Sequence, residues 1–186
     1  TDLGEQLGAY ADGVISDVQT RTATIAQDKR LSVYYGEGKD GLNTIIAGSI
    51  HAQVFDMVGA ELIAGKDSLQ EEKRGGGTVS LETVLDKNPD AIVFGPDSIG
   101  KTAAEDASWA SLDAVKGKRY YTVAGEPYNW IGRPPGPNRL LGVQWLGSVL
   151  YPETFTYDMV AKTKEFYSLF YRHELTDEEA LALLGR

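Results

Sequence analysis

The sequence contains no cysteine and only two histidines, His51 and His173. Without cysteine the chain forms no disulfide, no thiolate zinc site and no cysteine nucleophile. Two histidines alone supply too few soft ligands for a zinc site. We therefore expect no metal or other cofactor that is held by this chain alone. The lack of cysteine leaves the compartment open, because an exported protein can also lack it.

Long hydrophobic runs and basic stretches are missing as well. No apolar run approaches the roughly 20 residues that a membrane-spanning helix needs. The net charge of -9 and the absence of a lysine- or arginine-rich stripe argue against a nucleic-acid partner. The 186 residues, 42% hydrophobic, suffice for one globular domain with an appended element. The chain has no signal peptide and starts at Thr1 rather than Met, so we expect a processed N-terminus or a piece of a longer chain.

Motifs for catalysis are absent too. We find no GxSxG, HExxH, GxGxxG or Walker motif. Residues 75–77 are three glycines, but they lack the spacing of a phosphate-binding loop and do not join a strand to a helix. Carboxylates are plentiful, yet no motif fixes two of them at an acid/base spacing. We therefore expect a binding protein rather than an enzyme.

The hydrophobic pattern predicts alternating strands and helices. Strands are expected at 31–35, 60–63, 91–94 and 119–123. Helices are expected at 3–26, 49–57, 80–88, 98–106, 138–151 and from Thr176 onward, with an aromatic-rich segment at 155–171 and a mobile surface loop at 65–79. This order is typical of an α/β fold. We expect a three-layer sandwich with a small, mostly parallel four-stranded, Rossmann-like sheet.

The first predicted helix is unusually long for a small domain. About 24 residues at 1.5 Å each give a length of roughly 36 Å. Such a helix normally braces another part of the protein. At the very start of this chain it lacks a preceding partner.

The predicted connections that leave the strands are long, polar and rich in glycine. They cover residues 36–49, 64–79, 95–98 and 124–137, and ligands bind at this edge of a parallel sheet. The most irregular stretch, 128–137, holds three prolines and two glycines around Trp130 and Arg133. A large aromatic ring and a guanidinium group suit a planar or anionic ligand. The alternative is that Trp130 only fills the core and Arg133 is solvated.

The two histidines have different expected roles. His51 lies near a helix start at the predicted binding edge, where it either contacts the ligand or serves the structure. His173 follows the aromatic segment 155–171, where a surface or helix-capping role is expected.

Several motifs together resemble one family. They are the segments 30–35, 48–49, 58–64, 79–82, 88–93, 109–118, 130–134, 141–146 and 150–153. The chain resembles, over essentially all of its 186 residues, the substrate-binding proteins of ABC importers for iron chelates, haem, cobalamin and molybdate or tungstate. Members have two α/β lobes that are joined by one long helix. The resemblance implies a connecting helix at 1–29 and a C-terminal lobe at 30–186, with the N-terminal lobe absent.

The resemblance also implies site residues. In the family the loop matching 128–133 lines the cleft between the lobes, and the segment near Ser49 faces it. The implied ligand contacts are Trp130, Arg133, Tyr128, His51 and Asn129. One acidic residue in each lobe docks on the permease; cobalamin-type relatives carry it where this chain has Gly132, so Glu126 is the implied substitute.

The implied function is capture of an iron-siderophore, or a related metal chelate or oxyanion, and its delivery to a membrane permease and its ATPase. Haem, cobalamin, molybdate and tungstate remain open as ligands. The implied location is periplasmic or extracellular, with membrane anchoring as a lipoprotein whose signal is not in this chain. The alternatives are an α/β domain of a metallocofactor enzyme and a sensor domain that uses the lobe for protein contacts.

Overall fold

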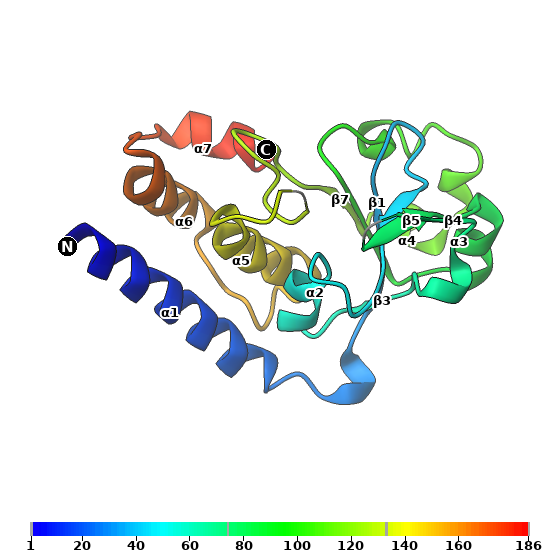
Figure 1. Cartoon of the computed structure of the whole chain (residues 1–186). Helices are drawn as coiled ribbons and strands as arrows, with labels where there is room; N and C mark the ends of the chain where they lie inside the picture. Colours follow the sequence, from blue (N-terminus) through cyan, green and yellow to red (C-terminus); the bar gives the residue numbers. More distant parts are fainter. Residues whose placement is uncertain (1, 74, 133, 186) are drawn as a thin grey trace.

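The structure is a computed structural model that describes residues 2–73, 75–132 and 134–185 (Figure 1). Its helices are α1 (Asp2–Thr22), α2 (Gln53–Met57), α3 (Leu81–Lys87), α4 (Asp113–Lys116), α5 (Asn138–Leu150), α6 (Met159–Phe166) and α7 (Asp177–Leu183). Its strands are β1 (Ser32–Gly36), β2 (Asn43–Ile45), β3 (Glu61–Leu62), β4 (Glu71–Lys73), β5 (Gly76–Thr78), β6 (Ala91–Phe94) and β7 (Tyr120–Thr122). Single helical turns lie at Gln27–Lys29, Lys66–Ser68, Ile99–Lys101 and Trp109–Ser111, and a π-helical turn at Tyr167–Tyr171 continues α6.

The central sheet has four parallel strands in the order β3-β1-β6-β7. In its register Tyr35 pairs with Val93, and Val93 pairs with Tyr121. β6 is buried over its whole length, as an internal strand of a parallel sheet should be. The predicted α/β fold with a small parallel sheet and a long first helix is therefore confirmed.

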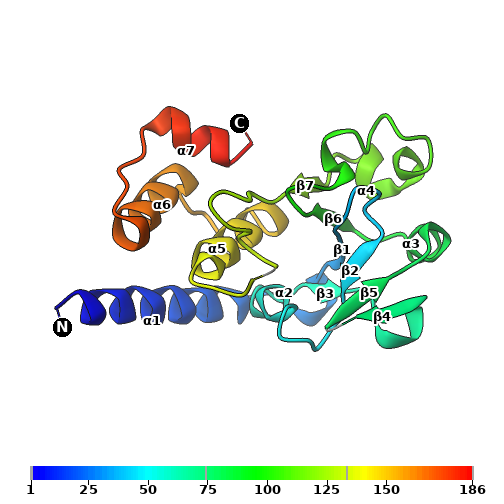
Figure 2. The same cartoon turned by 45° about the horizontal axis from the view of Figure 1, so that its top comes forward.

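Successive residues of the internal strands point to opposite faces of this sheet. Tyr34 packs with Trp109 and the residues of α3 and α4 on one face. Tyr35 packs with Phe55 of α2 and the residues of α5 on the other face. Figure 2 shows α3 and α4 on one side of the sheet and α2 and α5 on the other, which gives the three layers.

A second, antiparallel sheet corrects the expected mobile loop at 65–79. It has the order β2-β5-β4 and uses residues from both of the first two long connections. These strands are short and polar, so they carry no hydrophobic alternation. Gly77 permits the pairing, because a Cβ there would lie 2.0 Å from the carbonyl oxygen of Glu71.

Some of the predicted helices are also shorter than expected. The segment 98–106 forms the single helical turn Ile99–Lys101, followed by non-helical turns. A Cβ on Gly100 would lie 2.3 Å from Oγ1 of Thr122, so close packing against the strands decides this backbone. α2 starts at Gln53 without a side-chain cap, and Ser49 lies in the preceding turn instead of capping it.

Helix α1 runs along one side of the molecule, and its first turns extend beyond the body (Figures 1 and 2). Only Val14 and Val18 are buried in it. Its end is fixed by the Thr22 hydroxyl, which donates to the carbonyl oxygen of Met57 at 2.6 Å. It ends at Thr22, four residues before the expected end.

The C-terminal helices agree with the sequence pattern. α5 is buried on most of its surface. At α7 the predicted capping box is present: the Thr176 hydroxyl accepts from the amide of Glu179, and the Glu179 carboxylate accepts from the amide of Thr176. Among the described residues, no helix combines the length and the apolar character that a bilayer crossing requires.

A small polar cluster ties α1 to the chain near Tyr157. Arg21 pairs with Asp17 at 2.9 Å, lies 4.7 Å from the centre of the Tyr157 ring and donates to the carbonyl oxygen of Thr154. The Tyr157 hydroxyl donates to Asp17. Burial acts to raise the pKa of the Asp17 carboxyl group, but hydrogen bonds from Tyr157 and Arg21 outweigh it and hold this pKa below its ordinary value.

We expect Asp17→Asn to lower the free energy of unfolding by about 1 kcal/mol at pH 7, because it weakens these hydrogen bonds on a half-exposed surface. Because the pKa of Asp17 is lower in the folded state, its contribution to stability is fully present at pH values above the unfolded pKa of about 3.9. This contribution is lost as the pH falls through the folded pKa. The difference from wild type should therefore shrink between about pH 5 and pH 3 in urea denaturation. Asp12→Asn, on an exposed position of α1, is the control; an equal loss in both variants would contradict the prediction.

Candidate functional site

The connection after β7 lies across the carboxyl ends of β6 and β1. A Cβ on Gly125 would lie 2.7 Å from Pro96, just beyond β6. Further along, the Asn129 amide donates to the hydroxyl of Tyr35 on β1 at 3.2 Å. The segment 124–132 therefore covers the ends of β6 and β1, at the edge where parallel sheets bind ligands.

Trp130 is the anchor of this segment. Its side chain is 0% exposed, its amide donates to the carbonyl oxygen of Ala124 at 3.2 Å and its ring Nε1 donates to that of Glu126 at 3.4 Å. A fully buried ring offers no surface to a ligand in this structure. In this structure Trp130 supports the loop, which is the alternative that the sequence left open, and its contact with a ligand stays a prediction.

Helix α5 packs directly on Trp130. A Cβ on Gly142 would lie 1.9 Å from the carbonyl oxygen of Trp130 and 3.2 Å from its Cβ, so only glycine permits this approach. Asn138, 3% exposed, donates from Nδ2 to the carbonyl oxygen of Tyr128 at 3.0 Å. The helix therefore holds the loop both at its first turn and one turn further on.

The aromatic segment after α6 holds the same loop from the other side. The hydroxyl of Tyr167 donates to the carbonyl oxygen of Glu126, and that of Tyr171 donates to Oδ1 of Asn138. Burial raises the pKa of Tyr167 to about 12, so this hydroxyl keeps its proton at neutral pH.

A polar cluster joins the loop to the end of β1. Oδ1 of Asn129 accepts from the amides of Ile131 at 2.8 Å and Gly132 at 2.9 Å. The Tyr35 hydroxyl, which accepts from Asn129, lies 3.2 Å from Oε1 of Glu37 and donates to it. Asn129 is therefore placed at the predicted edge, while Tyr35 and Glu37 are members of the site that the sequence analysis missed.

Tyr128 is the most exposed aromatic side chain of this loop, at 56%. It lines a cavity of about 250 Å³ together with Tyr171, Asn138 and the proline- and glycine-rich residues Pro134, Gly136 and Pro137. The lining is almost entirely apolar. This surface suits the apolar or planar part of an organic ligand. The role of Tyr128 in ligand binding stays a prediction.

His51 lies in the turn between β2 and α2 and packs against Gly75. A Cβ added at Gly75 would lie 2.8 Å from Cδ2 of His51. Arg139 in the first turn of α5 reaches this turn: its Nη2 donates to the carbonyl oxygen of Ile50 at 3.0 Å. Burial lowers the pKa of the Arg139 guanidinium. The first turn of α5 thus contacts both the His51 turn and, through Asn138, the Tyr128 loop.

Arg139 was not singled out from the sequence. The available signal was a lone basic residue at the start of an otherwise apolar helix. Arg133, expected to contact the ligand, lies outside the described residues. Within residues 2–73, 75–132 and 134–185 no three histidine, aspartate or glutamate side chains gather as a metal site.

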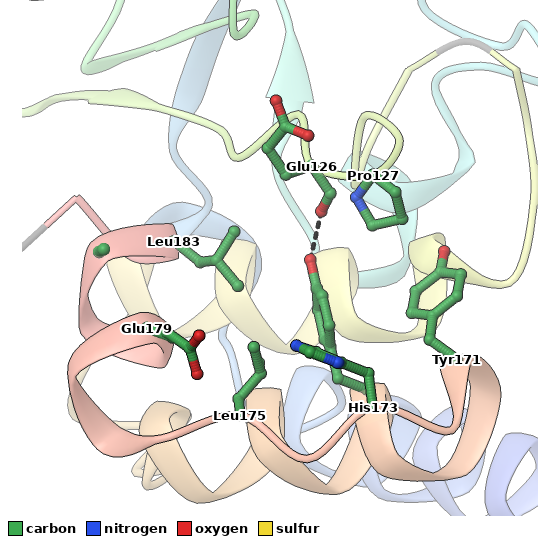
Figure 3. A pocket seen from close by; sticks show the side chains of 9 residues that line it. Glu126, Pro127, Tyr171, His173, Leu175, Glu179 and Leu183 are labelled. Atoms are coloured by element: carbon green, nitrogen blue, oxygen red, sulfur yellow. Dashed lines mark hydrogen bonds between the residues drawn. The ribbon is translucent and has the colours of Figure 1, made fainter.

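Glu126 borders a larger cavity of about 690 Å³ on the other side of Tyr171. Figure 3 shows the rings of Tyr171 and His173 and the side chains of Leu175, Glu179 and Leu183 around it, with Glu126 and Pro127 at one end. The Glu126 side chain is exposed, as a docking residue must be, and its docking role stays a prediction. His173 is exposed and lines this cavity, in agreement with the expected surface position.

Comparison with known proteins found no matching family model. The chain is 26% identical over 160 residues to the uncharacterized ABC transporter substrate-binding lipoprotein YvrC of Bacillus subtilis. The matched region covers 81% of this chain and 45% of YvrC. The structure of this chain superimposes on that of an ABC transporter solute binding protein of Sulfurospirillum deleyianum with a TM-score of 0.90 and 32% identity. The match covers all of this chain and 57% of the other.

Two further solved structures are similar. A periplasmic solute binding protein of Veillonella parvula gives a TM-score of 0.79 at 26% identity, over 97% of this chain and 54% of the other. The molybdate periplasmic binding protein MolA of Haemophilus influenzae, bound to molybdate, gives 0.75 at 27% identity, over 93% and 52%.

These proteins confirm the predicted resemblance to ABC transporter substrate-binding proteins. Their names are those of binding proteins and not of enzymes, which agrees with the expected binder. The chain spans about half the length of the relatives that it matches.

We expect Gly142→Ala to lower the free energy of unfolding by about 1–3 kcal/mol, because the new methyl group would push α5 away from Trp130. Gly13→Ala is a matched control in another helix, since a Cβ there would meet nothing within 4 Å. That variant should be stabilised by up to about 1 kcal/mol, the helix propensity of alanine over glycine. Urea denaturation of both variants measures the difference, and a neutral Gly142→Ala would refute the close packing.

Proposed function

We propose that this chain is the ligand-binding part of a substrate-binding protein of an ABC importer. The observation that carries the proposal is the segment 124–132, which is held across the carboxyl ends of β1 and β6 and in which Tyr128 is exposed. A rigid loop at this edge presents side chains to a ligand without itself forming a catalytic set. The similarity to solute-binding proteins supports the same role.

The proposed ligand is an iron-siderophore or a related metal chelate. The apolar cavity beside Tyr128 supports this choice, since an organic chelate has apolar surface to bury there and a bare oxyanion has none. Molybdate is the competing ligand, because MolA, 27% identical to this chain, is bound to molybdate in its structure.

We further propose that residues 1–29 connect this lobe to a second one and that residues 30–186 form one wall of the cleft. The matched relatives support this arrangement by being about twice as long as the chain. The first turns of α1, which extend beyond the body, are available for contacts with that lobe (Figure 1).

The proposed partners are a membrane permease and its ATPase, with Glu126 as the docking carboxylate of this lobe. The exposed position of Glu126 supports this role. The proposed location is outside the cytoplasmic membrane, with a lipid anchor on the complete protein. The lipoprotein name of the Bacillus subtilis relative and the periplasmic names of the structural neighbours support it.

Titration calorimetry of the complete protein and of residues 1–186 tests the proposal. The probes are a ferric catecholate, a ferric hydroxamate, haem, cobalamin and sodium molybdate. We expect the complete protein to bind one of the ferric chelates and residues 1–186 to bind it at least about 100-fold more weakly, about 2.7 kcal/mol. Tight binding by residues 1–186 alone would overturn the two-lobed cleft. Binding of molybdate alone would overturn the chelate assignment.

In the complete protein we expect Tyr128→Ala to weaken binding of that ferric chelate about tenfold or more, because the variant removes an exposed aromatic wall. Tyr128→Phe, which keeps the ring, is the control and should bind within about threefold of wild type. Unchanged affinity in the alanine variant would remove Tyr128 from the binding surface.

A further inference from the structure

Tyr35 is completely buried, yet its hydroxyl reaches the ligand edge of the sheet. The side chain is 0% exposed, and its ring packs on Phe55 with centroids 5.5 Å apart. The neighbouring Tyr34 is equally buried, at 1%, but points to the other face and donates to the carbonyl oxygen of Gly41 at 2.8 Å. One strand therefore carries two buried tyrosines, and the hydroxyl of Tyr35 is hydrogen-bonded to the loop after β7.

Glu37, which follows β1 and accepts the hydrogen bond from Tyr35, is itself fixed in place. Its amide donates to the carbonyl oxygen of Asn43 at 2.6 Å, and its carbonyl oxygen accepts from the amide of Asn43 at 3.1 Å. This bridge to the start of β2 holds the backbone from which the carboxylate reaches Tyr35. The hydrogen bond between Tyr35 and Glu37 thus orients the phenolic oxygen so that its lone pairs face Asn129.

Asn129 links the Tyr35 hydroxyl to the backbone of the loop by hydrogen bonds. Its Nδ2 needs the Tyr35 oxygen at 3.2 Å, and its Oδ1 accepts the two successive amides of Ile131 and Gly132. An asparagine amide that is fixed at one end has its other end fixed as well, because the group is planar. The turn at 129–132 is therefore set by the hydrogen bond that Asn129 donates to Tyr35 on β1.

Gly132 closes over the same atoms. A Cβ there would lie 3.0 Å from Oε1 of Glu37, 3.0 Å from the Tyr35 hydroxyl and 3.2 Å from Nδ2 of Asn129. The loop backbone thus sits on the polar cluster with no space for a side chain between them. Displacement of any of these three groups moves the loop.

We propose that Tyr35 and Glu37 are positioning residues that set the conformation of the loop 128–132 and, through it, the ligand affinity of the proposed site. Tyr35 touches no ligand, since it is wholly buried; it acts through Asn129. The consequence for affinity rests on the proposed function, whereas the consequence for the loop does not.

The test compares Tyr35→Phe with Tyr34→Phe in the complete protein. Each variant removes one hydroxyl from a buried ring on β1, so general effects on stability are matched. Amide hydrogen exchange by NMR should become at least about tenfold faster at Ile131 and Gly132 in Tyr35→Phe, and affinity for the ferric chelate should fall at least about fivefold. Tyr34→Phe should leave both quantities unchanged.

Two variants of Glu37 provide a second measurement on a partly exposed residue. Glu37→Gln keeps a side-chain oxygen that accepts from Tyr35 and should retain slow exchange, while Glu37→Ala should reproduce the effect of Tyr35→Phe. Equal exchange at Ile131 and Gly132 in wild type, Tyr35→Phe and Glu37→Ala would overturn the positioning role. Faster exchange with unchanged affinity would overturn its link to binding.

These outcomes separate the inference from the proposed function. If the wild-type protein binds none of the ferric chelates, haem, cobalamin or molybdate, the proposed function fails. The exchange rates at Ile131 and Gly132 then still support or overturn the role of Tyr35 in positioning the loop.

Discussion

The contact between Trp130 and Gly142 is the constraint on which the proposed ligand-binding edge of the sheet depends. The indole ring of Trp130 fills the core below the loop. The backbone of α5 at Gly142 packs against the backbone carbonyl group of Trp130. Because the ring is fixed, the residues on either side of it in the chain are fixed as well. Tyr128 is thereby left at the surface and Asn129 is turned toward β1. One buried side chain thus determines which of its neighbours can meet a ligand.

The main features of the fold follow from patterns that are visible in the sequence. The continuous apolar run of β6 indicates a strand covered on both faces, and the capping residues at Thr176 mark a helix start. The antiparallel sheet could not be predicted in this way. Its strands are polar, and their pairing depends on the absence of a side chain at Gly77, which is a property of three-dimensional packing rather than of periodicity.

The site was predicted at the level of its loop but not of each residue. The proline and glycine content of 128–137 indicated an irregular segment, and the structure places residues 124–132 across the carboxyl ends of β1 and β6. Which aromatic faces outward depends on the exact path of the backbone, so the sequence could not distinguish Trp130 from Tyr128. Tyr35 and Arg139 reach the site from elements whose hydrophobic pattern indicates only burial.

The many bonds to this loop have one energetic consequence. The carbonyl groups of Ala124, Glu126 and Tyr128 accept hydrogen bonds from Trp130, Tyr167 and Asn138. A loop without such partners would lose conformational freedom when a ligand bound, and that loss would subtract from affinity. Here the ordering cost is met during folding, by the burial of aromatic rings and the packing of α5. The stability of this part of the core and the affinity of the proposed site are therefore coupled, so substitutions far below the surface can alter binding without touching a ligand.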